Sequence, residues 1–175
     1  MKNNFLNKMD FIIFVVIFIS LLVIYMNYTN TKKFKENPIS KYSKQQIEDK
    51  RVELVSIIEK KFYLSLDIPI IVMDNKNLIF KNSRAWGITE YKNGNIKIYI
   101  KKNILKESEK YVLNTVLPHE FAHAIMFKNN HFYEGKEGHN SKWKEICETI
   151  SNDTCSMYVD REKVVKQKID AFFSF

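Results

Sequence analysis

The sequence predicts an α+β domain behind an amino-terminal transmembrane helix. Three observations support this: an uncharged apolar run at residues 11–26, alternating apolar residues after an Asn-Gly turn, and apolar residues at helical spacing nearer the carboxyl end. The expected order is a helix, a small mostly antiparallel sheet, and then further helices, which is typical of α+β proteins. We therefore expect an anchor at residues 1–29, a linker at 30–45 and one domain at 46–175.

The apolar run at residues 11–26 contains Ser20 as its one clearly polar residue. As a helix it would be about 24 Å long, against a bilayer core of about 30 Å. Tyr25 and Tyr28 can lie at the interface and a flanking lysine can reach it, so residues 11–28 are expected to contact the lipid bilayer. Because no small-x-small site follows the run, a retained single-pass anchor is favoured over a cleaved signal peptide, and a buried soluble helix is the other alternative.

The side of the membrane that the domain faces is left open by the flanking charges. Lysines lie at both ends of the apolar run: Lys2 and Lys8 before it, and Lys32, Lys33 and Lys35 after it. The positive-inside rule favours a cytoplasmic domain, whereas short amino-terminal anchors commonly have the opposite orientation. Cys147 and Cys155 do not decide the matter, because two cysteines eight apart, one on a helix stripe, are expected to be free thiols rather than a bridge.

Outside its central helix, the domain is expected to contain two hairpins between helices. A first helix is indicated by apolar residues at helical spacing, namely Ile47, Val55, Ile58 and Phe62. Residues 68–73 are apolar, 74–77 turn the chain, and 78–81 return as the second strand of a hairpin. Residues 90–99 turn at Asn93-Gly94, and alternating isoleucines follow as a half-buried strand: Ile96, Ile98 and Ile100. A closing helix is indicated by Val165, Ile169 and Phe172.

Residues 111–127 are apolar almost all round, which predicts a helix buried in the core. This helix contains His119, Glu120 and His123, and polar groups buried in a core must be satisfied. Pro118 has no backbone N–H, so the helix is expected to start near Asn114 or Thr115 with the proline in its first turn or just past it.

The spacing of four residues places His119 and His123 on one face of the helix, where their imidazoles can hold one metal ion between them. Glu120 lies beside them, close enough to act as general base on a zinc-bound water without being a ligand. This pattern predicts a zinc-dependent hydrolase, most often a peptidase acting on protein or peptide substrates. The alternative is that both histidines only hydrogen-bond to neighbours in the core.

A catalytic zinc needs a third protein ligand, and His139 is the leading candidate. It follows a glycine-containing turn and precedes two residues that can cap a helix. That helix carries an apolar stripe of Trp143, Ile146, Cys147 and Ile150. The rival ligands are Glu145 and Glu148 on the same helix, away from the stripe, and His131 in a polar loop is given no role.

The sequence His-Glu-Phe-Ala-His at 119–123, with Glu-Gly-His-Asn-Ser-Lys-Trp at 137–143, resembles the SprT-like (spartan-like) zinc metalloprotease family. That family pairs HExxH with a later His and an aromatic residue four positions on, a place that Trp143 fills. The sequence Arg-Ala-Trp-Gly at 84–87 and the strand after it resemble the family's strand pair, so the resemblance covers about residues 46–150. It implies a zincin-like metalloprotease core in which His119, His123 and His139 hold Zn²⁺ and Glu120 is the general base.

The chain also departs from the family. Many members carry a four-cysteine zinc ribbon after the core, whereas this chain has two cysteines, so a second zinc site is not expected. Asn140-Ser141 stands where a small Gly-Pro-like pair often follows the third histidine. Besides zinc, Arg84 and Tyr133 are the candidates to polarise the oxyanion.

The net charge of +8 favours anionic lipid or nucleic acid as a partner, although ordinary solubility explains it equally well. DNA is therefore a possible partner without a dedicated binding motif. Two alternatives to a membrane-anchored zinc endopeptidase stay open. One is a non-catalytic, zinc-stabilised basic module that binds nucleic acid or an anionic partner at a membrane. The other is DNA-stimulated cleavage of crosslinked proteins, which the family resemblance implies.

Overall fold

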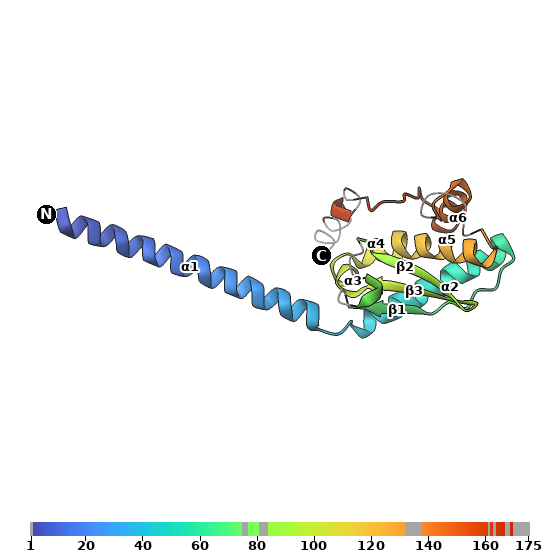
Figure 1. Cartoon of the computed structure of the whole chain (residues 1–175), viewed down its shortest axis with the longest axis horizontal. Helices are drawn as coiled ribbons and strands as arrows, with labels where there is room; N and C mark the ends of the chain where they lie inside the picture. The colour runs from blue at the N-terminus through green and yellow to red at the C-terminus, as the bar shows by residue number, and fades with distance from the viewer. Residues whose placement is uncertain are drawn as a thin grey trace. The chain divides into compact units, whose positions relative to one another are not determined.

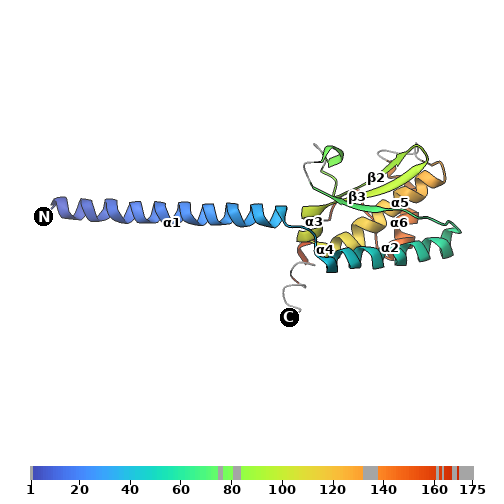
Figure 2. The ribbon, with the colours of Figure 1, turned by 90° about the horizontal axis from the view of Figure 1, so that it is seen from below.

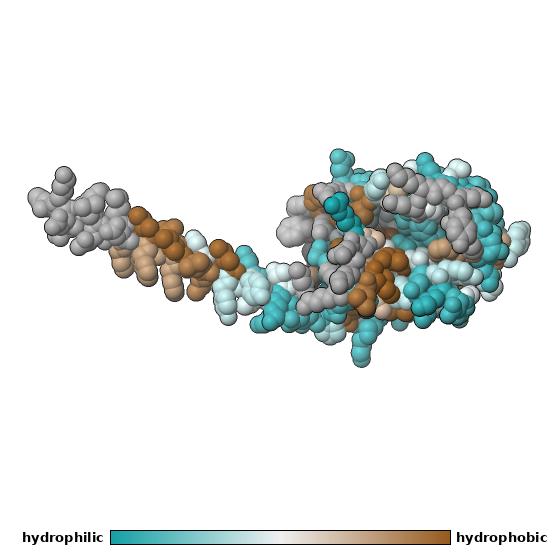
Figure 3. Space-filling view, viewed as in Figure 1, coloured by the Kyte–Doolittle hydropathy of each residue, from teal (hydrophilic) through white to brown (hydrophobic). Residues whose placement is uncertain are grey.

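The computed structural model describes residues 2–74, 77–80, 84–131, 138–160, 162, 164–166 and 169. The chain divides into two units, residues 1–38 and residues 39–175. The first unit is helix α1 (Lys2–Glu36), and its segment 11–34 has a mean hydropathy of 2.6. By length and composition this segment could cross a membrane, as a signal sequence also could. Figure 3 shows its hydrophobic side chains exposed along the helix.

The second unit begins with α2 (Lys41–Phe62), which confirms the first predicted helix. The Ser40 hydroxyl accepts a hydrogen bond from the Ser43 N–H at 2.9 Å, so a serine caps the start of the helix. At the other end, Tyr63 takes the left-handed conformation and donates its N–H to the Glu59 carbonyl. The irregular connection between α1 and α2 covers residues 37–40, which is shorter than the linker expected at 30–45.

The sheet that the structure describes has three strands in the order β1-β3-β2: β1 (Ile70–Met73), β2 (Gly87–Lys92) and β3 (Asn95–Lys101). Strands β2 and β3 form the antiparallel hairpin predicted around the Asn-Gly turn. Asn93 and Gly94 both have positive φ, 53° and 80°, as a two-residue turn of this kind requires. Because β1 pairs with β3 in parallel, the sheet has one parallel and one antiparallel pairing and is not mostly antiparallel as predicted.

The hairpin predicted across residues 68–81 is wrong. Residues Leu78–Phe80 form a short 3₁₀ turn in place of a returning strand. Asn77 stabilises this turn, because its side-chain oxygen accepts from the Ile79 N–H at 3.2 Å and its carbonyl accepts from the Phe80 N–H at 3.0 Å. Local hydrogen bonding therefore replaces strand pairing here, and β1 finds its partner in β3, much later in the sequence.

The short helix α3 (Lys102–Glu107) ends at Ser108, and the central helix follows in consecutive pieces: α4 (Glu109–Tyr111), a π-helical turn η2 (Val112–Val116) and α5 (Leu117–Lys128). Helical backbone begins at Glu109, earlier than the start expected near Asn114 or Thr115, and Pro118 lies in the first turn of the α5 piece. The proline has no N–H to donate to Asn114, and the Leu117 N–H donates to the Val112 carbonyl five residues back. The wider π turn accommodates the proline, and the residues after it continue as α-helix.

Helix α6 (Ser141–Ser151) has the predicted cap and the predicted buried face. The Asn140 side chain accepts from the Trp143 N–H at 2.8 Å. All four stripe residues are buried: Trp143, Ile146, Cys147 and Ile150. Asn152 ends the helix in the left-handed conformation with φ 53°.

The closing helix predicted beyond α6 is described only in part. Residues 164–166 are helical. Val165 and Ile169, two of the residues that suggested this helix, are exposed. Phe172 lies outside the described residues.

The long helices α2, α5 and α6 lie on one side of the sheet (Figures 1 and 2). Helix α5 contacts β2 and β3 as well as α2 and α6, so it is enclosed by the other elements. The core between them includes Leu54, Ile98, Ile100, Phe121, Ile125 and Ile146. Burying each such side chain contributes about 1.5–3 kcal/mol, so the backbone that carries residues 119–123 is held firmly in place.

Candidate metal centre

Three imidazole nitrogens converge at one point. His119 and His123 lie one turn apart on α5, and His139 comes from the turn that precedes α6. Their Nε2 atoms are 3.3 Å apart for the first pair and 3.0 Å apart for each of the two pairs with His139. In the described part of the chain, this is the group of side chains that could hold a metal ion.

The chemistry of these three groups fits zinc. Ligands at about 2.0–2.1 Å in tetrahedral positions would place neighbouring nitrogens about 3.3 Å apart, close to the separations here. Burial lowers the pKa of His119 to about 4 and that of His123 to about 3, with further lowering by the neighbouring histidines. Both rings are therefore neutral at pH 7, the form in which imidazole binds a metal.

Trp143 packs against all three rings. Its ring centroid lies 4.7 Å from that of His119, 5.5 Å from that of His123 and 4.4 Å from that of His139. The aromatic residue four positions after His139 thus supports the whole cluster from α6. Gly138 has φ +74°, a conformation that favours glycine, and it turns the chain immediately before His139.

Glu120 is buried where α5 packs against β2. The Thr89 hydroxyl lies 2.7 Å from Glu120 Oε2 and 2.9 Å from the Glu120 carbonyl oxygen, and with one proton it donates to one of them at a time. Burial raises the pKa of Glu120 to about 7, while hydrogen bonds from the Thr89 hydroxyl and backbone oppose the rise. A carboxyl group with that pKa can exchange a proton near neutral pH.

Gly87 provides the space for this carboxylate. A Cβ atom at position 87 would lie 2.7 Å from Glu120 Oε1, closer than van der Waals contact allows. The sequence pointed to Gly87 only through the family resemblance and did not identify Thr89. The signal was present, because alternate residues of β2 share one face, so 87 and 89 both face α5.

A cavity of about 870 Å³ opens at the histidines and Glu120. Its walls are the start of β2, helix α5 and the segment after α6, with aromatic side chains that include Trp86, Tyr111 and Tyr158. Arg84 lines the cavity and is exposed, whereas Tyr133 lies outside the described residues.

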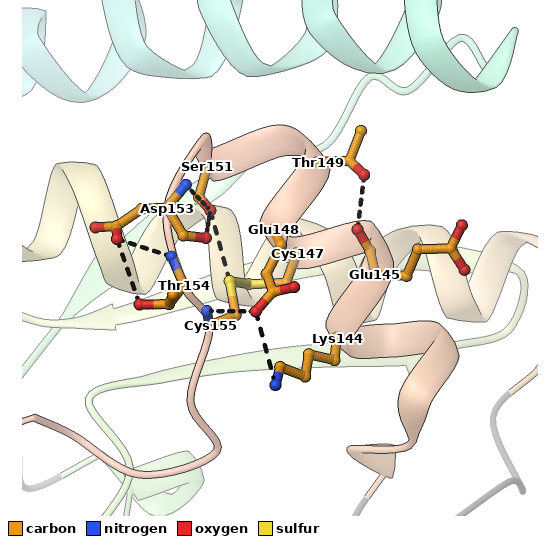
Figure 4. A network of polar contacts seen from close by, with 9 residues as sticks. All are labelled: Lys144, Glu145, Cys147, Glu148, Thr149, Ser151, Asp153, Thr154 and Cys155. Atoms are coloured by element: carbon orange, nitrogen blue, oxygen red, sulfur yellow. Dashed lines mark hydrogen bonds and ion pairs between the residues drawn. A yellow bond between two sulfur atoms is a disulfide. The ribbon is translucent and has the colours of Figure 1, made fainter.

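The rival carboxylates are engaged elsewhere, and neither belongs to the histidine cluster. Glu148 accepts from the Cys155 N–H at 3.4 Å and lies 3.8 Å from the Lys144 ammonium, as Figure 4 shows. Glu145 pairs with Lys142 at 3.5 Å on the exposed face of α6. His131, which was given no role, also lies outside the cluster.

The prediction of free thiols is wrong, because Cys147 and Cys155 form a disulfide with a Cα–Cα distance of 6.0 Å (Figure 4). The left-handed residue Asn152 reverses the chain after α6 and returns Cys155 to the helix. The spacing of the cysteines alone does not show this reversal.

Comparison with known proteins agrees with this geometry. The model of the SprT-like family matches residues 54–163, which is more than half of the chain. The match includes the sheet, the three histidines, Glu120 and both cysteines. No curated protein sequence gives a significant match. The chain therefore belongs to the SprT-like family, which is associated with metallopeptidase-like domains.

Proposed function

We propose that this chain is a membrane-anchored zinc-dependent endopeptidase of SprT-like type with a zincin-like core. The observation that carries the proposal is the convergence of three Nε2 atoms within 3.0–3.3 Å of one another, with the buried carboxyl of Glu120 at the adjacent position of α5. In this proposal His119, His123 and His139 hold Zn²⁺ and Glu120 is the general base. The substrate is a protein or peptide that enters the cavity beside them.

The zinc, when bound, would lower the pKa of water to about 7 and would polarise the peptide carbonyl. Glu120 takes a proton from the attacking water at its carboxylate and then gives that proton to the nitrogen of the leaving amine. Thr89 orients the carboxylate and Gly87 leaves room for it, so the base is already in place before the substrate binds.

Residues 11–28 of α1 are proposed to lie in the bilayer. Their large apolar side chains are exposed, and in water such a surface would be unfavourable. A cleaved signal sequence is the alternative, and the two differ in the mature chain. We expect the protein recovered from the membrane fraction to keep residues 1–29, as amino-terminal sequencing or intact mass would show.

The experiment that tests the activity uses the full chain in detergent. It measures zinc per chain and cleavage of an unfolded protein, with and without DNA, for the wild type and for Glu120→Gln. The variant should keep zinc and lose about 100-fold or more of the activity, which is the usual scale for a general base. Cleavage by the variant at the wild-type rate would contradict the mechanism.

The same assay separates the alternatives. Zinc binding with salt-dependent DNA binding and no cleavage would indicate the non-catalytic basic module. Cleavage that requires DNA would indicate proteolysis of DNA-crosslinked proteins.

A further inference from the structure

The segment of residues 152–160, called the strap below, forms the wall of the cavity that lies opposite β2. Residues 154–160 line the cavity together with the histidines. The strap leaves α6 at its carboxyl end and continues without helix or strand to Asp160. Since no regular secondary structure holds the strap in place, its position depends on individual contacts.

Contacts near both ends of the strap attach it to the domain. Near its start, Cys155 is bonded to Cys147 of α6. One residue later, the backbone carbonyl of Ser156 accepts a hydrogen bond from the ring of His119. At its end, the Asp160 N–H donates to the hydroxyl of Tyr111 at 3.1 Å. The contact with His119 therefore lies directly beside the disulfide.

The ring of His119 is held from two sides. Its Nε2 faces the other two histidines, so the nitrogen that donates to Ser156 is the one on the other side of the ring. Such a hydrogen bond fixes the tautomer and orientation of a metal-binding histidine, and losing an outer partner of this kind typically costs about 10–100-fold in metal affinity.

The other contacts around the disulfide are weak in comparison. The Cys155 N–H donates to Glu148 at 3.4 Å, and the Ser151 hydroxyl donates to the Asp153 carbonyl at 2.9 Å (Figure 4). These groups are partly or largely exposed to solvent, where water competes for each hydrogen bond. Beyond Ser156 the strap is held by Val159, which packs against the core, and by the Asp160–Tyr111 hydrogen bond; next to Ser156 the covalent bond is the strongest contact.

We infer that the Cys147–Cys155 disulfide is a positioning element of the candidate metal site: it fixes Cys155 and so holds the Ser156 carbonyl against the ring of His119. The inference rests on the proposed metal site. It adds that the site binds metal fully only when Cys147 and Cys155 are oxidised to the disulfide. Only the oxidised chain has the ring of His119 held both by the other two histidines and by the tethered Ser156 carbonyl.

The need for an intact disulfide bears on the side of the membrane on which the domain works. Structural disulfides persist outside the cytosol, whereas cytosolic thiols are kept reduced. The domain therefore belongs on the oxidising side of the membrane, an orientation that the flanking lysines leave open. Its substrates would be proteins of that compartment, not proteins crosslinked to cellular DNA.

The test compares the oxidised and reduced full chain in detergent. A trialkyl phosphine reduces the disulfide to two thiols and is itself oxidised to the phosphine oxide, with water supplying the oxygen and the two protons. After the phosphine is removed without air, Zn²⁺ affinity is measured by competition with a chromophoric chelator, and Co²⁺ is added to record its visible spectrum.

Reduction should weaken Zn²⁺ binding by about 10–100-fold and change the Co²⁺ spectrum, while near-ultraviolet circular dichroism shows that the domain stays folded. The double variant Cys147→Ser, Cys155→Ser should match the reduced wild type and not respond to phosphine. The control Glu148→Gln keeps the disulfide and should bind Zn²⁺ within about twofold of the wild type. Equal affinity and equal spectra before and after reduction would overturn the inference.

If the reduced chain unfolds, a chain whose two cysteines are joined by a methylene bridge provides the test. Treating the two thiols with diiodomethane forms an S–CH₂–S bridge and releases two iodides and two protons, so the tether is restored without a disulfide. The bridged chain should regain the oxidised affinity, and a folded bridged chain that does not regain it would overturn the inference.

The failure of this inference can be told apart from the failure of the proposed function, and the redox state of the cysteines can also be tested in cells. No step measures peptide cleavage, so the inference can fail while the enzyme proposal stands, whereas oxidised wild type that binds no Zn²⁺ would defeat the enzyme proposal itself. In cells, acid-quenched full chain should react with a maleimide polymer only after reduction. Modification of both cysteines without reduction would overturn the inference.

Discussion

The two walls of the cavity support different parts of the proposed site. On the sheet side, Gly87 and Thr89 of β2 contact Glu120, the proposed base. On the strap side, Ser156 contacts His119, a proposed ligand. The comparison indicates that one wall positions the proton-transfer group and the other positions the metal, so changes in the two walls should affect different measurements.

The walls also differ in what holds them. Strand β2 is fixed by its hydrogen bonds to β3 and by packing against α5, and it belongs to the fold itself. The strap has a disulfide and a few hydrogen bonds, so its position depends on redox conditions as well as on folding. One wall of the cavity therefore forms when the sheet folds, whereas the other is fixed in position only when Cys147 and Cys155 are oxidised.

The largest loss of Zn²⁺ affinity is expected when a ligand is removed, and the effects of changes in the two walls can be compared with that loss. His139→Ala leaves two imidazoles, and Zn²⁺ affinity should fall by more than the roughly 10–100-fold expected for an outer partner. Competition with a chromophoric chelator measures the loss. His131→Ala is the matched control, because this histidine lies outside the cluster, and its affinity should be unchanged. Equal affinities for the two variants would show that His139 is not a ligand.

Gly87→Ala tests the sheet wall. The added methyl group would lie 2.7 Å from Glu120 Oε1, so the carboxylate must move away from its position. We expect kcat to fall by about 100-fold, close to the effect of losing the base, while Zn²⁺ affinity stays the same. Peptide cleavage and chelator competition on one preparation give both values.

Gly94→Ala is the contrasting variant for that experiment. Gly94 has φ +80°, and apart from its chain neighbours no atom lies within 4 Å of the place that a Cβ would occupy, so alanine strains the turn without touching the site. The variant should lose about 1–2 kcal/mol of unfolding free energy and keep its kcat. If both glycine variants lose activity equally, the effect at position 87 is a general loss of stability.

The parts of the molecule that the sequence revealed are those with a local pattern. The spacing of His119 and His123, the cap before Trp143 and the Asn-Gly turn each depend on a few neighbouring residues, and each corresponding element is present in the structure. The histidine pair also required a third donor, and His139 lies where it can supply one.

The features that the sequence did not reveal depend on contacts between distant residues. The pairing of β1 with β3 joins segments whose local patterns are equally compatible with a hairpin. The disulfide requires a chain reversal at Asn152, for which a single residue in the left-handed conformation is responsible. Strand alternation places Thr89 on the same face as Gly87, but its hydrogen bond to Glu120 forms only because β2 packs beside α5, which the sequence alone does not show.

Thr89→Val sharpens the assignment of the sheet wall with a smaller effect. Valine has a similar shape but lacks the hydroxyl that donates to Glu120, so the pKa of Glu120 should rise further. A base with a higher pKa stays protonated to higher pH, so the acidic limb of kcat/KM should move to higher pH. We expect about a tenfold lower kcat/KM near neutral pH, since part of the hydrogen bond can be replaced by water.

The matched control keeps the hydroxyl. Thr89→Ser can still donate to Glu120, so its pH profile should follow the wild type. A wild-type profile for Thr89→Val as well would show that this hydroxyl does not act on the base, and the sheet wall would then matter through Gly87 alone.

The smallest effect is expected on α6 beside the strap, where Lys144→Ala removes the ion pair with Glu148. The two charges are 3.8 Å apart, and the Lys144 side chain is exposed and that of Glu148 partly exposed, so the unfolding free energy should change by less than about 0.5 kcal/mol in a denaturant titration. Glu148 can still accept from the Cys155 N–H and the disulfide is untouched, so Zn²⁺ affinity should be unchanged. If this variant weakened Zn²⁺ binding as much as reduction does, surface charge rather than the covalent bond would position the strap, and the distinction between the two walls would need a different physical basis.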